Sequence, residues 1–175
     1  MALSLEQKKA MTAEVNAVAQ TALAAVAAEY RGIKATAMDS LRSQARKEGV
    51  YLRVVKNSIA RRAVAGTSFE CMTDSFSGPL LLAFSTEDPG SAARVVKKFA
   101  KENDRLVPKL VALGGTLYPA SALDRVASLP TRDEALSILM ATMRAPVQKF
   151  VTTLNEVPSK LVRTVAAVRD AKEAG

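Results

Sequence analysis

Four short apolar runs within the first 130 residues are each bounded by polar or turn-forming residues, a pattern typical of β-strands. The run at 22–30 is also compatible with a helix, but its shortness and the Arg-Gly pair that follows favour a strand. Pro108 indicates an edge position or a bulge in the last run, because proline donates no ladder hydrogen bond. The predicted strands are ALAAVAAEY (22–30), YLRVV (51–55), GPLLLAFST (78–86) and LVPKLVALGG (106–115).

Between these runs, apolar residues recur with the helical period, and capping residues mark where helices are expected to begin. Ser4 and Gln7 form a capping-box pattern that predicts a helix to about residue 20. Asp88 and Pro89 are expected as N-cap and first residue of a helix that runs to about Glu102. Further helical segments are predicted from Thr36 and Asp39 to Gly49, after Asn57, within FECMTDSF (69–76) and near SALDRVAS (121–128).

The alternation of strands and helices predicts an α/β (α+β) domain over residues 1–130, with a small mixed sheet flanked by helices. After it, Thr131 and Glu134 form a second capping-box pattern, and helix-period residues continue to about Lys172 with no strand signal. We therefore expect residues 131–175 to form a separate, long C-terminal helical segment.

This segment contains an 11-residue repeat. LMATM (139–143), FVTTL (150–154) and LVRTV (161–165) each have two apolar residues, any residue, a threonine and an apolar residue. Eleven residues are almost three helical turns, so equivalent positions drift by only about 20° per repeat. The repeats thus form one apolar stripe, whose expected partner-binding residues are Leu139, Met140, Met143, Phe150, Val151, Leu154, Leu161, Val162 and Val165.

The apolar stripe could pack back onto the domain, as the apolar faces of most amphipathic helices do. A helix from Thr131 to Lys172 is roughly 60 Å long, whereas a domain of about 130 residues has a radius of gyration of about 14 Å. Most of the stripe therefore needs another partner, in the manner of helix-in-groove recognition. Pro146 and Pro158 are expected to kink the helix near the repeat boundaries.

The chain has 25 Lys and Arg against 17 Asp and Glu, for a net charge of +8 and a pI of about 9.8. This excess of positive charge predicts a polyanionic partner and says nothing about the fold. The single cysteine, Cys71, excludes an internal disulfide framework and a cysteine-based zinc site, and it indicates a reducing compartment. No signal peptide is recognisable, and no apolar run approaches the roughly 20 residues that span a bilayer. We expect a cytoplasmic protein with no membrane partner.

The residue types argue against an enzyme. The chain has no histidine, so the commonest general base and metal ligand is absent. It has no glycine-rich phosphate motif, and Gly114-Gly115 is interpreted as a turn. Carboxylate pairs such as Glu87-Asp88 lie at expected helix starts, where the helix macrodipole accounts for them. We expect no catalytic residue, metal site or cofactor, and a nucleotide-binding α/β enzyme is the alternative from another class.

The positive charge is concentrated between Arg42 and Arg62, where seven cations face one acid, for +6 of the chain's +8. In the helix predicted after Asn57, a step of about 100° per residue puts Arg61 and Arg62 on the polar side, opposite a packed side. Such a surface suits closely spaced phosphates, which arginine can bind bidentately. The charge does not distinguish RNA from DNA, and an ordinary solvated basic face is the alternative.

Two further features belong to this corner and its surroundings. Lys56 lies where the strand turns into the helix, so that a phosphate could reach both its side chain and free helix amides. Tyr51 offers a stacking surface for a base. A second basic stripe has helical spacing, but because its apolar neighbours are expected to pack inward we interpret it as plainly solvated. It consists of Arg94, Lys97, Lys98 and Lys101.

Six segments in order along nearly the whole chain resemble the bacterial family of the large-subunit ribosomal protein numbered ten, which forms the base of the ribosomal stalk. They are AEYRGI (28–33), VYLRVVKNSIARRAV (50–64), GPLLLAFS (78–85), PGSAARVVKKFAK (89–101), SLPTRDEAL (128–136) and KLVRTVAAVRDAKEA (160–174). The stretch APVQKFVTTLNEVPS (145–159) looks like an extension of the C-terminal helix relative to shorter members.

The resemblance implies an α/β domain bound to large-subunit ribosomal RNA beside another stalk-base ribosomal protein. It also implies a C-terminal helix that carries dimers of acidic stalk proteins, which recruit translation factors and help stimulate their GTP hydrolysis. Family members further repress their own messenger RNA. Carried over by position, the RNA-facing residues are Arg53, Lys56, Asn57, Ser58, Arg61 and Arg62, with Arg31 and Lys34 beside them.

The three repeats predict three acidic dimers per chain, one per repeat, or two if the first repeat acts only as a hinge. A free RNA-binding regulator that never joins ribosomes is a further alternative to the ribosomal scaffold.

Overall fold

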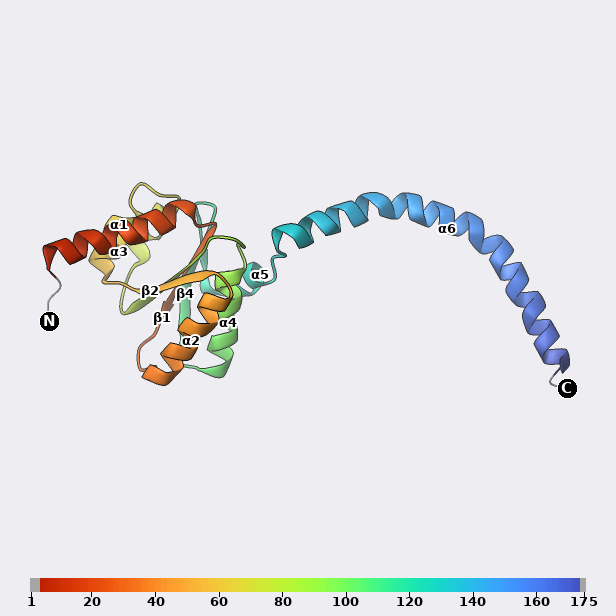
Figure 1. Ribbon diagram of the computed structural model, residues 1–175, viewed down its shortest axis with the longest axis horizontal. Helices are drawn as coiled ribbons and strands as arrows, with labels where there is room; N and C mark the ends of the chain where they lie inside the picture. Colours follow the sequence, from red (N-terminus) through yellow and green to blue (C-terminus); the bar gives the residue numbers. More distant parts are fainter. Residues whose placement is uncertain (1–3, 174–175) are drawn as a thin grey trace. The chain divides into compact units, whose positions relative to one another are not determined.

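The computed structural model describes residues 4–173, and the chain divides into two compact units between Thr131 and Arg132. The first unit contains a sheet flanked by helices, and the second is a single long helix (Figure 1). The predicted fold class, an α/β domain followed by a long C-terminal helix, is confirmed.

The sheet has five strands in the order β2-β3-β1-β4-β5, with β1 at its centre. Helix α2 (Ala35–Lys47) connects β1 to β2 and helix α4 (Ser91–Glu102) connects β3 to β4, but another strand is inserted between the members of each connected pair. All four neighbouring pairs are consequently antiparallel, so the expected mixed sheet is wrong in this respect. The strands are β1 (Ala24–Glu29), β2 (Val50–Val54), β3 (Leu80–Ser85), β4 (Val107–Leu113) and β5 (Thr116–Pro119).

The two central strands are buried on both faces, which explains why their sequences read as continuous apolar runs. Successive residues of β1 alternate between two apolar clusters: Val26 and Ala28 join one, while Ala25 and Ala27 join the other. Each cluster is closed by its own layer of helices. The first is covered by α2 (Ala35–Lys47), α4 (Ser91–Glu102) and α5 (Leu123–Ala127), and the second by α1 (Leu5–Thr21), α3 (Asn57–Val64) and the 3-10 turn η1 (Glu70–Ser75).

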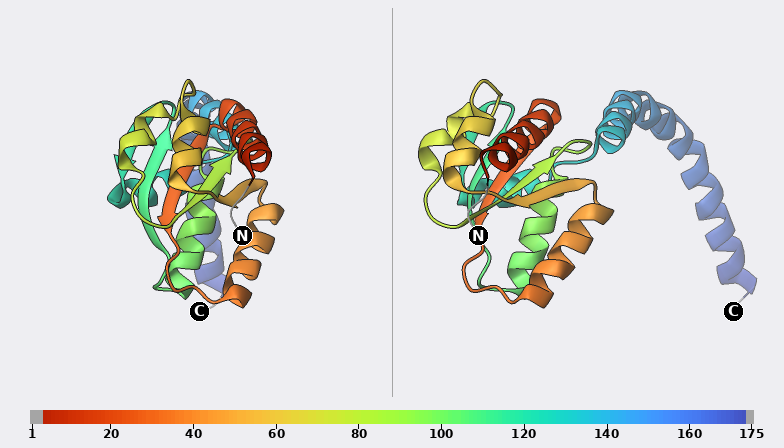
Figure 2. Two further views of the ribbon diagram at one scale, coloured as in Figure 1. Left: turned by 90° about the vertical axis from the view of Figure 1, so that its left-hand side faces the viewer. Right: turned by 60° about the vertical axis from the view of Figure 1, so that its left-hand side comes forward.

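The two helix layers lie on opposite sides of the sheet, and Figure 2 shows α2 and α4 side by side on one of them. The capping box predicted at the start of α1 is confirmed. The amide of Gln7 donates to the Ser4 hydroxyl at 3.2 Å, and the Ser4 amide donates to the Gln7 side chain at 3.0 Å.

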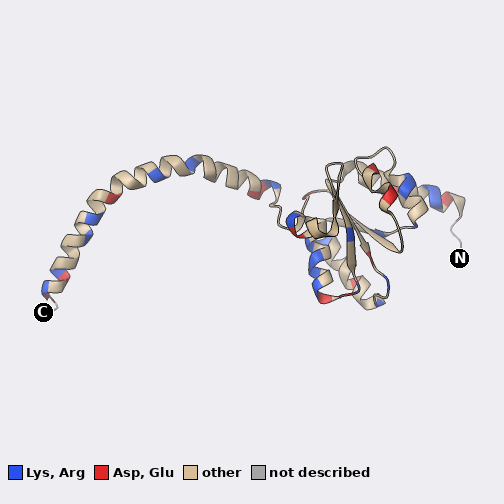
Figure 3. Cartoon of the chain, turned by 180° about the vertical axis from the view of Figure 1, so that it is seen from behind, with Lys and Arg blue, Asp and Glu red and all other residues tan. Residues whose placement is uncertain are grey.

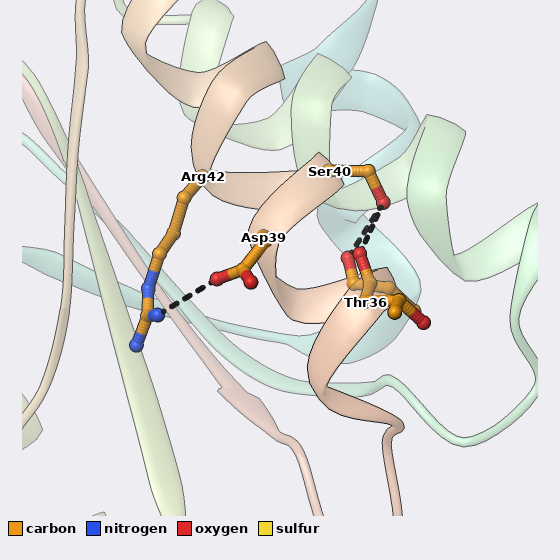
Figure 4. A network of polar contacts seen from close by, with 5 residues as sticks. Thr36, Asp39, Ser40 and Arg42 are labelled. Carbon is orange, nitrogen blue, oxygen red and sulfur yellow. Dashed lines mark hydrogen bonds and ion pairs between the residues drawn. The ribbon is translucent and has the colours of Figure 1, made fainter.

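Two predicted helix starts are wrong. Helix α2 has Lys34 as its N-cap, and Thr36 and Asp39 lie inside the helix. There, Asp39 pairs with Arg42 at 3.2 Å, while the Ser40 hydroxyl donates to the carbonyl of Thr36 (Figure 4). The acid therefore supports a neighbouring arginine within the helix instead of capping its first turn.

Helix α4 begins at Ser91 with Gly90 as its N-cap, so Asp88 and Pro89 precede the helix. The backbone around Gly90 approaches the end of α5 closely: a Cβ at this position would lie 3.1 Å from the carbonyl oxygen of Val126. A glycine therefore fits the cap position, and Asp88 instead forms an ion pair with Arg94 at 3.5 Å.

At Pro108, both expectations for a strand proline are met. The register of β1 against β4 shifts next to Pro108, and β5 pairs only with Leu110–Leu113, so β4 is at the edge of the sheet there. Gly114 and Gly115, both with positive φ, form the two-residue hairpin turn that joins β4 to β5. The glycine pair predicts this turn, but no pattern in the sequence predicts the short strand β5 that follows it. The short 3-10 turn η2 (Ala120–Ala122) then leads into α5.

The second unit is helix α6 (Arg132–Glu173). It continues through Pro146 and Pro158, and Figure 1 shows one helix that curves along its length without separating into segments. None of its residues, all of which the structure describes, is buried. No helix in residues 4–173 is both long and apolar enough to cross a membrane.

Candidate functional site

Helix α3 has the amphipathic form that the sequence predicts. Its apolar side chains, Ile59, Ala60, Ala63 and Val64, are buried in the cluster beneath α1 and α3. Ser58, Arg61 and Arg62 are exposed on the other side. The polar surface of α3 is therefore held in a fixed orientation by the packing of its apolar side.

Helix α1 lies against α3 and completes this surface. Val15 and Ala19 of α1 are buried in the same apolar cluster. The side-chain amide of Asn16 donates to the carbonyl of Ala63, near the end of α3, at 2.7 Å. Because this hydrogen bond and the apolar contacts join the two helices, α1 contributes its own side chains to the polar surface of α3.

A groove of about 570 Å³ runs between α1 and α3, and four cations line it. Lys56 and Arg62 were predicted from the sequence, whereas Lys8 and Lys9 of α1 were missed as site residues. Ser58 lines the groove as well, and no carboxylate is among the described residues that do. We call these five residues the α1/α3 groove. Such a cluster of unopposed cations is a favourable place for closely spaced phosphates.

Two of the predicted site residues form hydrogen bonds to the backbone within the domain. The guanidinium of Arg61 donates to the carbonyl of Phe76 at 3.0 Å, and the side-chain amide of Asn57 donates to the carbonyl of Gly78 at 2.9 Å. Both bonds fix the loop before β3 against the start and middle of α3. Arg61 and Asn57 therefore have structural roles that the helical pattern did not indicate.

The corner is less purely positive than the sequence suggests, because Glu14 of α1 lies beside it. Its carboxylate accepts a hydrogen bond from the Tyr51 hydroxyl at 2.7 Å and pairs with Arg53 at 3.4 Å. Burial of the Tyr51 ring, together with this hydrogen bond to Glu14, raises the pKa of Tyr51 to about 12. The ring also packs near Phe84, with centroids 6.5 Å apart. Arg53 and Tyr51 thus have partners within the protein.

Arg31 and Lys34, the two remaining predicted residues, are exposed in the loop after β1. The last residues of β1 and β2 and the first residues of β3 lie at the same end of the strands. The loop after β1 therefore lies at the same end of the sheet as Lys56, which follows β2. The loop is fixed by Arg105, whose guanidinium donates to the carbonyl of Gly32 at 2.6 Å. Arg31 and Lys34 therefore add positive charge at the same end of the sheet as Lys56, but they do not line the α1/α3 groove.

In α6, every residue of the predicted apolar stripe is exposed, with Phe150 at 64% and Met143 at 72%. The three repeats also share one hydrogen bond. Thr142, Thr153 and Thr164 each donate a hydroxyl to the carbonyl three residues earlier, and all three distances are 2.8 Å. The repeated pattern in the sequence is therefore repeated in local structure, and each threonine satisfies its hydroxyl within the helix.

Charges accompany the stripe. Between residues 135 and 168, α6 carries four cations, Arg144, Lys149, Lys160 and Arg163, against the single acid Glu156. Glu156 lies 3.7 Å from Lys160. An exposed apolar stripe on a positive helix is suited to an acidic partner with an apolar groove.

Within residues 4–173, no three acidic or cysteine side chains are grouped in a way that could hold a metal ion. Cys71 is exposed in η1. The described residues thus present two exposed surfaces, one polar and cationic in the domain and one apolar on α6.

Two family models match the chain. The family model described as Ribosomal protein L10 matches residues 4–101, and the model described as Ribosomal protein uL10 C-terminal region matches residues 129–157. The chain is 74% identical over 174 residues to the large ribosomal subunit protein uL10 of Halorhodospira halophila, and 68% identical over 174 residues to that of Alkalilimnicola ehrlichii. Each alignment covers 99% of both chains.

Proposed function

Since the chain belongs to the uL10 family of large ribosomal subunit proteins, we propose that it forms the base of the ribosomal stalk, with its domain bound to large-subunit ribosomal RNA and α6 bound to acidic stalk-protein dimers. The relatives carry the name of a ribosomal protein, so the resemblance found in the sequence is confirmed and the nucleotide-binding enzyme is set aside. The protein works in the cytoplasm as part of the ribosome, beside another stalk-base protein, and serves translation factors through the stalk.

The α1/α3 groove supports the RNA-binding half of this proposal. Lys8, Lys9, Lys56 and Arg62 converge on one groove without a lining carboxylate. A phosphate backbone offers a row of charges to such a groove, and binding of this kind depends on charge and shape more than on base sequence. Ser58 can add a neutral hydrogen bond to a phosphate oxygen, while Arg31 and Lys34 lie along the neighbouring edge of the sheet.

The single observation that carries the stalk-binding half is the unburied stripe of α6. Its large apolar residues are about half or more exposed over 42 residues of helix. Soluble proteins rarely leave apolar surface of this extent without a partner. The three repeats, with their three equivalent threonine hydrogen bonds, support three equivalent dimers. Two dimers are expected if the first repeat acts only as a hinge.

Native mass spectrometry of the chain mixed with its acidic stalk proteins tests the number of dimers. We expect a seven-chain complex, and a five-chain complex would contradict three equivalent sites. Phe150→Asp should remove one dimer by placing a charge in the second repeat. Thr152→Asp is the matched control, because Thr152 lies on the other side of α6 at a helical step of about 100° per residue.

Co-sedimentation with large ribosomal subunits on a sucrose gradient separates the scaffold from a free RNA-binding regulator. The scaffold proposal requires the chain to travel with the subunits at physiological salt. Recovery only in the unbound fractions would favour the regulator, as would binding limited to the chain's own messenger RNA.

A further inference from the structure

We propose that the domain has a second RNA-binding surface on the opposite side of its sheet, formed by α2 and α4. We call it the α2/α4 face and define it by Arg46, Lys47, Lys98 and Lys101. Its ligand is the phosphate backbone of an RNA segment other than the one in the α1/α3 groove. The face is separate from the proposed RNA-binding groove and can be tested separately from it.

The cations of the α2/α4 face line two neighbouring hollows along α2 and α4. Lys47, Lys98 and Lys101 line one groove of about 800 Å³ that follows α4 from Ser91. Lys47 also lines a neighbouring hollow together with Arg46. Lys101 is ten residues after Ser91, a distance of roughly 15 Å along the helix. Figure 3 shows Lys and Arg in successive turns of α4. A linear row of this kind suits a linear polyanion.

The sequence alone predicts that the four cations of the basic stripe on α4 are simply solvated, and the structure shows that two of them form ion pairs. Arg94 pairs with Asp88 at 3.5 Å, and Lys97 pairs with Asp124 at 2.9 Å. The other two, Lys98 and Lys101, form no ion pair with any described residue.

On α2, Arg42 pairs with Asp39 at 3.2 Å (Figure 4), whereas Arg46 and Lys47 likewise form no ion pair within residues 4–173. The fold thus brings four unpaired cations from two helices to one surface, which neither helix shows by itself.

Carboxylates also line part of this groove. Glu48 and Glu87 lie where α2 ends and α4 approaches its start, and a Cβ at Gly49 would be 3.5 Å from the Glu87 carboxylate. Lys98 and Lys101 lie about two and three turns further along α4. We therefore assign the main phosphate contacts to Lys98 and Lys101, with Lys47 and Arg46 extending the surface past the acids.

The absence of apolar surface favours RNA over an acidic protein as the ligand. The large apolar residues that are exposed in residues 4–131 are Leu5, Leu23, Val107, Leu117 and Tyr118, and none of them lies on α2, α4 or α5. Protein partners usually contact an apolar, often aromatic, centre, whereas nucleic-acid interfaces are more polar and much more positive. The α2/α4 face has only the second character.

The two surfaces lie over different apolar clusters on opposite faces of the sheet. An RNA segment bound in the α1/α3 groove therefore leaves the α2/α4 face free. The consequence is that one domain can hold two RNA segments at once, which would fix their relative positions.

The first test measures how RNA affinity of the full chain depends on salt, with a short RNA duplex as the probe. Lys98→Gln/Lys101→Gln should lower the slope of log K against log salt by about 1.8, since each lost phosphate contact lowers it by roughly 0.9. The matched control Arg169→Gln/Lys172→Gln removes the same charge from the end of α6, beyond the three repeats, and should leave the slope unchanged. Equal slopes in the Lys98/Lys101 variant and the control would overturn the proposal.

The second test measures bridging. One duplex is immobilised, saturated with the protein and washed, and a fluorescent duplex is then added. The wild type and the α6 control should retain the second duplex, while Lys98→Gln/Lys101→Gln should bind the beads but retain only background fluorescence. Bridging that survives in this variant would contradict the second surface.

Two outcomes separate this proposal from the proposed function. Lys56→Gln/Arg62→Gln should weaken RNA binding at the α1/α3 groove. The contribution of the α2/α4 face to the salt dependence of RNA affinity should remain unchanged in this variant. If that variant is unaffected while the Lys98/Lys101 variant is weakened, the groove assignment fails and the α2/α4 face stands. If Lys98→Gln/Lys101→Gln instead loses only binding to poly-glutamate, with RNA slope and bridging unchanged, the face takes an acidic protein and the RNA proposal is wrong.

Discussion

Phe84 of β3 and Phe150 of α6 have the same side chain, but Phe84 is buried and Phe150 is exposed. Phe84 is 1% exposed between the sheet and the helices above it, and its ring lies 5.9 Å from that of Phe69. Phe150 is 64% exposed on a helix that buries none of its residues. In the first region apolar residues define a fold, because a second layer covers them. In the second they remain exposed, because α6 has no second layer of its own, and we propose that a partner covers them.

The largest effect that this comparison predicts is on folding. Phe84→Ala should lower the free energy of unfolding of the domain by about 3–5 kcal/mol, because it removes a buried aromatic ring and leaves a cavity. Phe150→Ala should change it by less than about 0.5 kcal/mol, as expected for an exposed position. Urea unfolding followed by circular dichroism measures both. A loss of several kcal/mol in Phe150→Ala would mean that α6 packs on a core.

A smaller contrast lies within α3. Arg62→Ala should lower the salt slope of RNA binding by about 0.9 and leave stability nearly unchanged, because Arg62 lines the α1/α3 groove. Arg61→Ala should cost about 1 kcal/mol of stability, since it removes the hydrogen bond to the carbonyl of Phe76. Paired urea unfolding and RNA titrations decide this. If the effects are exchanged, the roles assigned to the two arginines are wrong.

The smallest predicted effect concerns the pH dependence of stability. Tyr51 has a pKa of about 12 in the folded protein, against 10.0 for a free tyrosine, so folding favours the neutral phenol. Its contribution to stability should be fully present below about pH 10 and should be lost as the pH rises from 10 towards 12. Comparison with Tyr51→Phe isolates this contribution from that of other titrating groups.

The stability difference between wild type and Tyr51→Phe, measured by urea midpoints, should stay constant up to about pH 10 and then shrink. A constant difference up to pH 11.5 would contradict the raised pKa of Tyr51, which burial of the ring and the hydrogen bond to Glu14 together explain.

Local periodicity predicted most of the fold and only part of the site. The packed side of α3, the burial of β1 and β3, and the apolar stripe of α6 depend on spacing within one element, and all are present. The antiparallel sheet could not be predicted in this way, because it depends on which strand is inserted between the members of each connected pair.

The missed parts of the site likewise come from contacts between distant segments. Lys8 and Lys9 belong to the groove only because Asn16 and its apolar neighbours hold α1 against α3. Glu14 neutralises Arg53 from 39 positions away in the chain, a pairing that no local pattern predicts. The adjacent lysines of α1 were visible in the sequence, but nothing in their spacing connected them to Arg62.

The central claim is that the two regions bind different partners independently, and a chain ending at Pro130 tests it most directly. This shortened chain keeps the whole sheet and both helix layers, so it should unfold cooperatively. We predict that it binds large-subunit ribosomal RNA with the affinity and salt slope of the full chain and forms no complex with the acidic stalk proteins. A shortened chain that still captures the stalk proteins, or that folds but no longer binds the RNA, would contradict the account.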